Sequence, residues 1–352
     1  MQTRFGRSMG LAEKDVLILD PAVGTATFLY FVIQEIYENL EAMGLTGAWN
    51  DYVANHLLPR IFGFELLMAP YTVAHMKLGM QLRELGYEFQ SDQRLGIYLT
   101  NALEEPVIQK ETLGFAGFIT QEANRAAEVK RDKPIMVVLG NPPYFGHSAN
   151  QGDYTEELMK RYKKAVRDER NIQPLSDDSL KFICFAHHRI ERTGYGIVGM
   201  ITPHTYLSGL THRGMREQLL KTFDQIYVVN LHGNANKGET APDGSPDENV
   251  FDNIRQGVAI SLFVKRSDGT DSEAKCELCY TDLWGRRENK YEVLSENDVA
   301  SIEWEPLEPV APYYFFVPKD FSLQDEYDSC IDLEEVFGLY NVGGKPGDDS
   351  LL

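Results

Sequence analysis

Four consecutive residues, Asn141, Pro142, Pro143 and Tyr144, combine groups suited to an amine attached to a flat ring. The Asn141 side-chain oxygen and the Pro142 main-chain carbonyl are hydrogen-bond acceptors. Placed on the two N–H groups of one amine, they would pull its nitrogen toward a tetrahedral geometry and free its delocalised lone pair. The prolines fix φ and remove competing donors, so the carbonyl direction is preset. Tyr144 offers a face for stacking, and the resulting chemistry is positioning, without a metal or a strong base.

A second candidate site follows the first expected strand, Val16 to Asp20, and opens a helix from about Thr27. Ligands of open α/β sheets bind where strands end, and helix N-terminal amides can meet an anionic group. A single glycine here lets the backbone pass close to a ligand, but the three spaced glycines of the dinucleotide fingerprint are absent. This pattern favours a nucleotide-type ligand over simple packing. The candidate residues of this loop are Asp20, Pro21, Ala22, Gly24, Thr25 and Thr27.

Two further polar residues follow expected strands. Glu65 ends Ile61 to Glu65, where a carboxylate can accept hydrogen bonds from two ribose hydroxyls. Asn101 directly follows a third expected strand, Leu95 to Thr100, and occupies the analogous position for the ligand's base.

The elements that must position these residues alternate along the chain. Short apolar, β-branched runs alternate with amphipathic stretches, which predicts an α/β fold with a mostly parallel sheet and helices on both faces. The fourth expected strand, Met136 to Gly140, leads into the Asn141 turn. Residues 104–134 look less regular, and residues 233–250 form a long polar loop. Residues 258–265 are predicted to form a strand, and residues 275–281 to pair with it as a hairpin.

Composition bounds the class of protein. The 352 residues contain 43% hydrophobic and 25% charged residues, which is ordinary for a globular protein. No apolar run reaches the ~18 residues of a membrane span. Four cysteines in so long a chain make no disulfide scaffold, so we expect a cytoplasmic protein. Cys276 and Cys279 have zinc-ligand spacing but no second pair, so no metal site is predicted.

The net charge of −19 argues against nucleic acid as a partner, because phosphate binding needs Lys and Arg. A local basic cluster runs against this argument, since local field matters more than total charge at a groove. A solvated helix face explains the cluster equally well. The cluster comprises Lys160, Arg161, Lys163, Lys164, Arg167 and Arg170.

Taken together, these motifs resemble the amino-methyltransferases of the gamma arrangement, in which the cofactor motif precedes the catalytic one. Residues 196–203, 231–234 and 256–260 narrow the resemblance to the methyltransferase part of large single-chain restriction-modification enzymes. The resemblance implies a Rossmann-like, S-adenosylmethionine-dependent fold with a seven-stranded sheet and an antiparallel edge strand. It implies that Asp20, Pro21, Ala22, Gly24, Thr25, Thr27, Glu65 and Asn101 bind S-adenosylmethionine, and that Asn141, Pro142, Pro143 and Tyr144 bind an adenine flipped out of double-stranded DNA.

The resemblance also implies a domain organisation. We expect residues 1–282 to form the catalytic domain and 283–352 to begin a truncated target-recognition domain. Nuclease, helicase and target-recognition regions of a larger enzyme are the implied partners, and no membrane partner is expected. Family members carry a further cofactor-binding segment before the first strand, and the few residues preceding Val16 do not match it.

Two alternatives remain open. Protein glutamine methyltransferases also use an Asn-Pro-Pro-Tyr turn, because a side-chain amide nitrogen poses the same lone-pair problem. The second alternative is that the chain is an inactive cofactor-binding or DNA-docking fragment of a larger restriction enzyme.

Overall fold

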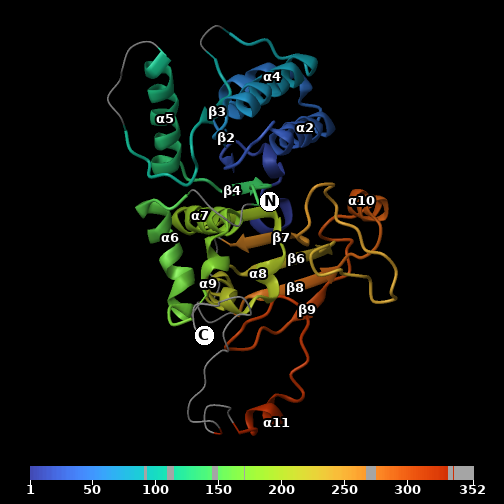
Figure 1. The fold of residues 1–352 in the computed structure, drawn as a ribbon. Helices are drawn as coiled ribbons and strands as arrows, with labels where there is room; N and C mark the ends of the chain where they lie inside the picture. Colours follow the sequence, from blue (N-terminus) through green and yellow to red (C-terminus); the bar gives the residue numbers. More distant parts are fainter. Residues whose placement is uncertain are drawn as a thin grey trace. The chain divides into compact units, whose positions relative to one another are not determined.

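The computed structural model describes residues 1–90, 93–108, 115–144, 150–169, 171–266, 275–331 and 336. The chain divides into a compact unit, Met1–Val317, and a second unit, Pro318–Leu352. Within the first unit, the described strands form one mixed sheet in the order β3-β2-β1-β4-β5-β7-β6-β8-β9 (Figure 1). The strands are β1 (Ile18–Asp20), β2 (Ile61–Glu65), β3 (Gly96–Leu99), β4 (Val137–Gly140), β5 (Gly196–Pro203), β6 (Gln225–His232), β7 (Val258–Lys265), β8 (Glu277–Asp282) and β9 (Glu305–Leu307).

The parallel half of the sheet has a switch point. β1 pairs in parallel with β2 on one side and with β4 on the other, β3 extends one flank, and β5 extends the other. Successive strands therefore run outward in opposite directions from the β1–β4 pair. Ligands of open α/β sheets bind at the carboxyl ends of strands beside such a point. Asp20 and Gly140 end the two strands there.

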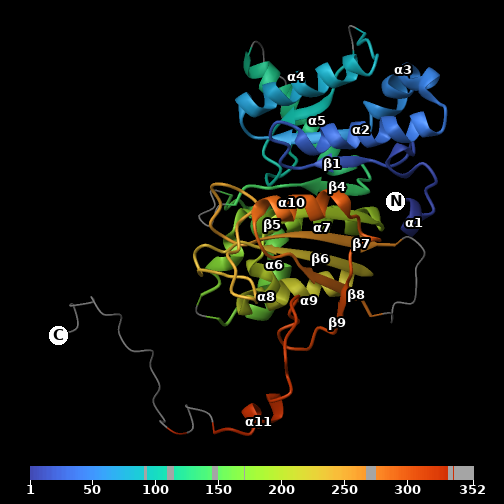
Figure 2. The same cartoon turned by 90° about the vertical axis from the view of Figure 1, so that its right-hand side faces the viewer.

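Helices cover both faces of the sheet, as expected. On β1, Ile18 packs into one buried apolar cluster and Leu19 into another, because successive strand side chains point to opposite faces. The first cluster includes residues of α2 and α4, which lie along the same side of β1 in Figure 2. The second is closed by α6, α7 and α9. The helices of the first unit are α1 (Gln2–Phe5), α2 (Thr27–Ala42), α3 (Trp49–Tyr52), α4 (Met68–Glu84), α5 (Phe115–Asp132), α6 (Asp153–Lys163), α7 (Asp178–Thr193), α8 (Thr205–Ser208), α9 (Arg213–Thr222) and α10 (Arg287–Glu296).

The predicted α/β class with a mostly parallel sheet is confirmed, but two details of the sheet differ. The sheet of the described residues has nine strands rather than seven. Its antiparallel strand β7 is internal rather than at an edge, because the chain returns after β6 and inserts between β5 and β6. A further short antiparallel strand, β9, closes the edge beside β8.

The predicted hairpin between 258–265 and 275–281 is wrong. β8 pairs in parallel with β6, because both edges of β7 are already bonded to β5 and β6. The stretch 104–134, predicted as irregular, contains the helix α5.

The second unit contains one short helix among its described residues, α11 (Gln324–Asp328). Much of the end of the stretch expected to begin a target-recognition domain, residues 332–335 and 337–352, lies outside the described part. The expectation for 283–352 therefore stays a prediction. In the part of the chain that the structure describes, no helix is long and apolar enough to cross a membrane.

Candidate active site

One pocket of about 960 Å³ joins the two groups of candidate residues. Its size is at the upper end of the range for small-molecule sites. It opens at the carboxyl ends of β1, β2, β3 and β4, beside the switch point of the sheet. Of the residues predicted from sequence, Pro21, Ala22, Gly24, Glu65, Asn101, Asn141 and Pro143 line it.

The loop after β1 turns through two residues with positive φ. Gly24 has φ +54°, a conformation that side chains with a Cβ rarely adopt. Ala26 has φ 62° and directly precedes α2. Thr25 and Thr27 are exposed and are not among the lining residues; the Thr27 hydroxyl instead accepts a hydrogen bond of 3.2 Å from Lys77 Nζ.

The Glu65 carboxylate is fixed by two backbone amides. Gly24 N donates to Oε2 at 2.9 Å, and Leu67 N donates to Oε1 at 2.8 Å. Each carboxylate oxygen has more than one acceptor position, so both oxygens can still accept a hydroxyl. A carboxylate held in this way against the glycine loop suits a ribose diol.

Asp20 is buried beneath the same loop. Its Oδ1 accepts from Ala22 N at 3.1 Å, while its Oδ2 has no hydrogen-bond partner among the described residues. Burial raises the pKa of the Asp20 carboxyl to about 7, although the Ala22 hydrogen bond opposes the rise. The negative charge of Glu65 adds to the rise. Asp20 therefore shapes the loop rather than facing the pocket.

Asn101 lines the same pocket, directly after β3. Its Oδ1 accepts from Leu103 N at 3.0 Å, and its Nδ2 donates to Asn150 Oδ1 at 2.8 Å. The buried Lys130 ammonium donates to the Asn101 main-chain oxygen at 2.6 Å. The side chain is thus held in place, with an acceptor position left on Oδ1 for a base amine.

The turn after β4 brings Asn141 and Pro143 to the pocket, whereas Pro142, which carries the second predicted acceptor, and Tyr144 are not among its lining residues. Asn141 is partly buried, Pro142 is buried and Pro143 is exposed. Tyr144 donates its hydroxyl to Asn141 Oδ1 at 2.6 Å. Burial raises the pKa of Tyr144, so the hydroxyl stays protonated and remains a donor.

A second aromatic ring lies beside Tyr144. The Phe251 ring centroid is 6.4 Å from that of Tyr144, with the planes at 60°. Both side chains pack against a buried cluster that includes Leu231 and Val250. Residues 145–149, which continue the turn, lie outside the described residues.

Several residues of the pocket were not predicted from sequence. Asn150, Asp178 and Phe182 line the pocket from beyond the turn and from α7. Asn150 donates to Asp178 Oδ2 at 3.1 Å and so connects α7 with Asn101. No local pattern marks these residues, because the fold alone brings them to the strand ends.

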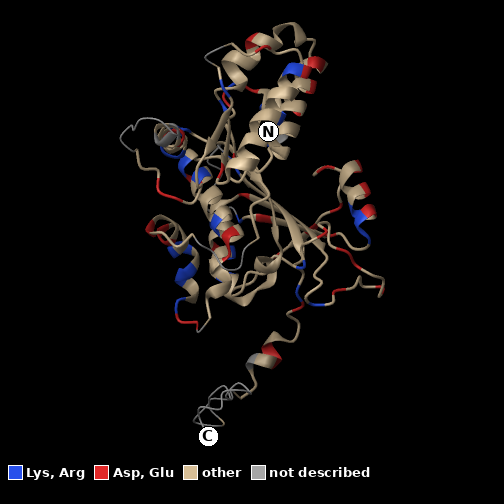
Figure 3. Cartoon of the chain, turned by 45° about the horizontal axis from the view of Figure 1, so that its top comes forward, with Lys and Arg blue, Asp and Glu red and all other residues tan. Residues whose placement is uncertain are grey.

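The predicted basic cluster is largely neutralised. Acidic residues begin α6 and basic residues end it, as the blue and red segments of Figure 3 show. Arg161 pairs with Glu191 at 2.7 Å, and Lys163 pairs with Glu156 at 2.6 Å. Lys160 and Arg167 also pair with neighbouring acids, Glu157 and Asp168. Arg170 lies outside the described residues, and the paired cations give little support for a phosphate-binding face.

Comparison with known proteins identifies the family. The family model described as "Eco57I restriction-modification methylase" matches residues 60–236, half of the chain. The chain belongs to the Eco57I restriction-modification methylase family. The match spans β2 to β6 and includes Glu65, Asn101 and the turn at Asn141. The predicted resemblance to restriction-modification methyltransferases is confirmed.

Solved structures of larger enzymes contain a similar fold. The Type ISP restriction-modification enzyme LlaBIII bound to DNA is 26% identical with a TM-score of 0.73, covering 90% of this chain and 21% of that chain. The DrdV–DNA complex is 26% identical with a TM-score of 0.68, and the match covers 87% of this chain and 28% of the DrdV chain. A nuclease-deletion mutant of LlaGI in complex with a DNA substrate mimic is 23% identical with a TM-score of 0.72, covering 89% and 29%, and shows the fold alone.

This methylase chain therefore spans between about a fifth and three tenths of the enzymes to which it is similar. No curated protein sequence matches it. The family assigns a DNA methyltransferase domain of a restriction-modification system, and family membership implies S-adenosylmethionine as the methyl donor. The polar groups of the pocket fit S-adenosylmethionine. They are a glycine loop before a helix, the two carboxylate oxygens of Glu65 and the side-chain amide of Asn101.

Proposed function

We propose that this methylase transfers a methyl group from S-adenosylmethionine to the exocyclic amine of an adenine flipped out of double-stranded DNA. The observation that carries the proposal is the shared pocket. Glu65 and Asn101, which suit a nucleoside, line the same cavity as Asn141, which suits an amine. A donor and an acceptor bound in one cavity can meet directly, so catalysis needs little more than orientation.

Gly24, Glu65 and Asn101 are the residues that would hold the cofactor. When bound, S-adenosylmethionine supplies a methyl group on a sulfonium, which an amine nitrogen can attack. Glu65 accepts from the ribose hydroxyls through the lone pairs that the amides of Gly24 and Leu67 leave free. Asn101 lines the same pocket and would meet the adenine of the cofactor there.

Asn141 and Pro142 act on the target base. The Asn141 side-chain oxygen and the Pro142 carbonyl each accept one N–H of the adenine amine. The nitrogen then becomes more tetrahedral and its lone pair more available for attack. The proton that leaves the methylated amine passes to solvent, because the described part of the turn holds no base that would capture it.

Tyr144 and Phe251 supply the aromatic surroundings of the base. Tyr144 offers its ring for stacking, and Phe251 approaches Tyr144 at an angle from the neighbouring loop. Stacking against an aromatic side chain is a sequence-tolerant way to hold an unpaired base and lowers the cost of flipping.

Double-stranded DNA is the proposed partner because the similar enzymes LlaBIII and DrdV were solved with DNA. Nuclease, helicase and target-recognition regions of such a larger enzyme are proposed as further partners. With a net charge of −19, the chain relies on those regions for much of its phosphate contact.

The test is a two-stage assay on the purified chain. Calorimetric titration first measures S-adenosylmethionine binding. Tritiated S-adenosylmethionine is then incubated with a pool of unmethylated duplexes, with Asn141→Ala as the control, and digested DNA is analysed for N6-methyladenine. Binding followed by N6-methyladenine supports the proposal. Cofactor binding with label only in a glutamine-containing protein substrate would favour a protein glutamine methyltransferase. Absence of cofactor binding by the folded chain would identify an inactive fragment.

A further inference from the structure

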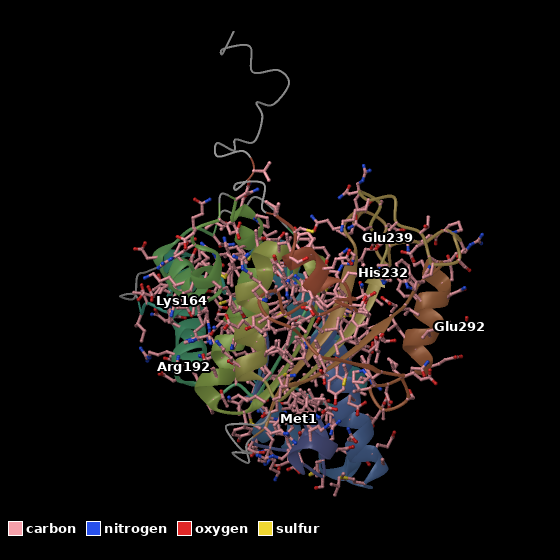
Figure 4. The ribbon with its side chains drawn as sticks, turned by 90° about the horizontal axis from the view of Figure 1, so that it is seen from below. Met1, Lys164, Arg192, His232, Glu239 and Glu292 are labelled. Atoms are coloured by element: carbon pink, nitrogen blue, oxygen red, sulfur yellow. The ribbon has the colours of Figure 1, made fainter. Side chains whose placement is uncertain are left out.

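Three metal-ligating side chains converge at the carboxyl edge of the sheet, outside the pocket. His204 directly follows β5, His232 ends β6, and Glu239 lies in the polar loop after β6. One ligand atom from each lies within 4.8 Å of the others, and His232 Nδ1 is 3.1 Å from Glu239 Oε1. Figure 4 shows His232 and Glu239 side by side, well away from Glu292 on α10.

The outer atoms of both histidine rings are held by hydrogen-bond acceptors. His204 Nδ1 faces Asn230 Oδ1 at 3.0 Å, and His232 Nε2 faces Asp282 Oδ1 at 2.5 Å. Metal-binding histidines characteristically donate their second ring N–H to such an outer acceptor, which fixes the tautomer and aims the first nitrogen at the ion. The two remaining nitrogens, His204 Nε2 and His232 Nδ1, belong to the converging cluster.

Packing fixes the orientation of the rings and of the carboxylate. His232 stacks on Trp284 with ring centroids 3.3 Å apart. A Cβ on Gly257 would come within 2.2 Å of the His204 ring, so the ring lies flat on this glycine. Asn234 N donates to Glu239 Oε2 at 2.9 Å, which leaves Oε1 directed at His232. The site is therefore built before any ion arrives.

The donor set favours a transition-metal ion such as zinc over calcium or magnesium. Two imidazole nitrogens and one carboxylate oxygen suit zinc, whereas calcium and magnesium prefer oxygen ligands alone. Three protein ligands leave a fourth position open. Asn234 is the one obstacle, because its Nδ2 lies 3.2 Å from His204 Nε2. A 180° flip of the Asn234 side-chain amide places its oxygen beside His204 Nε2 in place of the nitrogen. The flip loses the hydrogen bond that Lys237 N donates to this oxygen.

We propose that His204, His232 and Glu239 form a zinc site that ties the loop of residues 233–250 to the end of β6. The ion reaches the site from the Glu239 side, where 20% of that side chain is exposed, against 7% for His232. The fixed loop in turn supports Leu231 and Val250, against which Tyr144 packs. The proposal does not depend on methyl transfer.

The same atoms can hold a proton instead of an ion. Burial opposes a positive charge on His232, but hydrogen bonds to Asp282 and Glu239 outweigh it and raise the pKa of His232. A protonated His232 between two carboxylates would need no metal. The experiment must therefore distinguish zinc from this ion pair.

The test uses the full chain after treatment with a chelator. Zinc affinity is measured by competition with a chromophoric chelator, and cobalt(II) absorption reports the coordination number. We expect one ion per chain, a four-coordinate cobalt spectrum and a higher Tm with zinc. Glu239→Gln, which keeps the shape of the side chain, and His204→Ala should each weaken zinc at least ~100-fold. Asp282→Asn, which keeps the outer acceptor oxygen but removes its charge, should weaken it ~10–100-fold.

Matched controls are Glu292→Gln on the exposed face of α10 and His188→Ala on α7, which should bind zinc like the parent chain. Circular dichroism verifies that each variant is folded, and Glu239→Gln decides the matter if His204→Ala does not fold. The proposal is overturned if the parent chain takes up no zinc above the Glu239→Gln level. It is equally overturned if nitrogen NMR shows His232 protonated on both ring nitrogens at saturating zinc.

Discussion

The hydroxyl of Tyr144 donates to the side-chain oxygen of Asn141 at 2.6 Å, the oxygen proposed to accept from the target amine. The hydroxyl holds this oxygen in place before a base arrives, and the incoming amine then competes for it. The stacking ring and the hydroxyl of Tyr144 therefore contribute to different steps, and two substitutions separate them.

Tyr144→Phe keeps the ring and releases the Asn141 oxygen, so we expect methyl transfer within about tenfold of the parent chain. Tyr144→Ala removes the stacking face, which is worth ~1–3 kcal/mol per base, or roughly 5- to 150-fold in kcat/KM. Methylation kinetics on duplex DNA measure both. If Tyr144→Phe loses as much as Tyr144→Ala, the hydroxyl rather than the ring is the essential group.

Asn141→Ala should lower kcat by ~10²–10³, the cost of removing one preorganised hydrogen-bond partner of a transition state. Affinity for S-adenosylmethionine should stay nearly unchanged, because the side chain contacts the target base. Single-turnover methylation and calorimetry on the same sample give the two numbers. Asn55→Ala, at an exposed asparagine, is the matched control. An equal loss of cofactor affinity in Asn141→Ala would disprove the proposed role.

Glu65→Ala should weaken S-adenosylmethionine binding by ~1.5–3 kcal/mol, because hydrogen bonds to a charged acceptor are lost. The backbone amides of Gly24 and Leu67 also lose their acceptor. Calorimetry measures the dissociation constant, with the exposed Glu84→Ala as the control. An unchanged dissociation constant in Glu65→Ala would remove Glu65 from the cofactor site.

Asp20 predicts a pH dependence of stability. Burial raises its pKa from 3.8 to about 7, so the folded chain binds a proton between these values that the unfolded chain has released. The contribution of Asp20 to stability is fully present below pH ~4 and is lost as the pH rises through about 7. Asp20→Asn does not titrate. Its free energy of unfolding minus that of the parent should rise over this window, by at most about 4 kcal/mol.

Urea unfolding at a series of pH values tests the Asp20 prediction, and a constant offset between the two proteins does not affect it. A difference that stays flat between pH 4 and 7 would show that the Asp20 carboxylate is solvated or paired in solution.

The positions of Asn141 and Glu65 at the carboxyl edge of the sheet could be predicted from sequence, because Asn141 directly follows a short apolar strand and Glu65 ends one. Strand ends are local features, and the carboxyl ends of parallel strands meet at one edge. The N-cap of α7 is equally local: Asp177 accepts from Ser179 N at 2.8 Å.

The parts that could not be predicted depend on distant residues. Helix α5 has few large apolar residues. Arg189 of α7 stabilises the end of α5 by donating to the carbonyls of Val129, Lys130 and Lys133. The partner of β8 was predicted wrongly because sequence alone does not reveal that β7 is already paired on both edges. The His204–His232–Glu239 cluster likewise exists only once β5 and β6 are placed on either side of β7.

A buried ion pair holds the far end of the polar loop of residues 233–250. Lys290 Nζ lies 2.7 Å from Asp247 Oδ1, and neither side chain is exposed. Lys290 also donates to the Leu231 carbonyl at 2.7 Å. Asp247 accepts from Gly233 N at 2.6 Å and from Gly285 N at 2.8 Å. Every partner is thus satisfied, and removing one member leaves a buried charge without its counterion.

Lys290→Met should therefore lower the free energy of unfolding by ~3–5 kcal/mol, the cost of leaving one charge of a buried pair uncompensated. Lys160→Met is the matched control, since 70% of both side chains in the Lys160–Glu157 pair is exposed and such pairs contribute ~1 kcal/mol or less. Denaturant unfolding compares the two variants. A loss in Lys290→Met no larger than in Lys160→Met would mean that water reaches Asp247, and the loop would then be held by its hydrogen bonds alone.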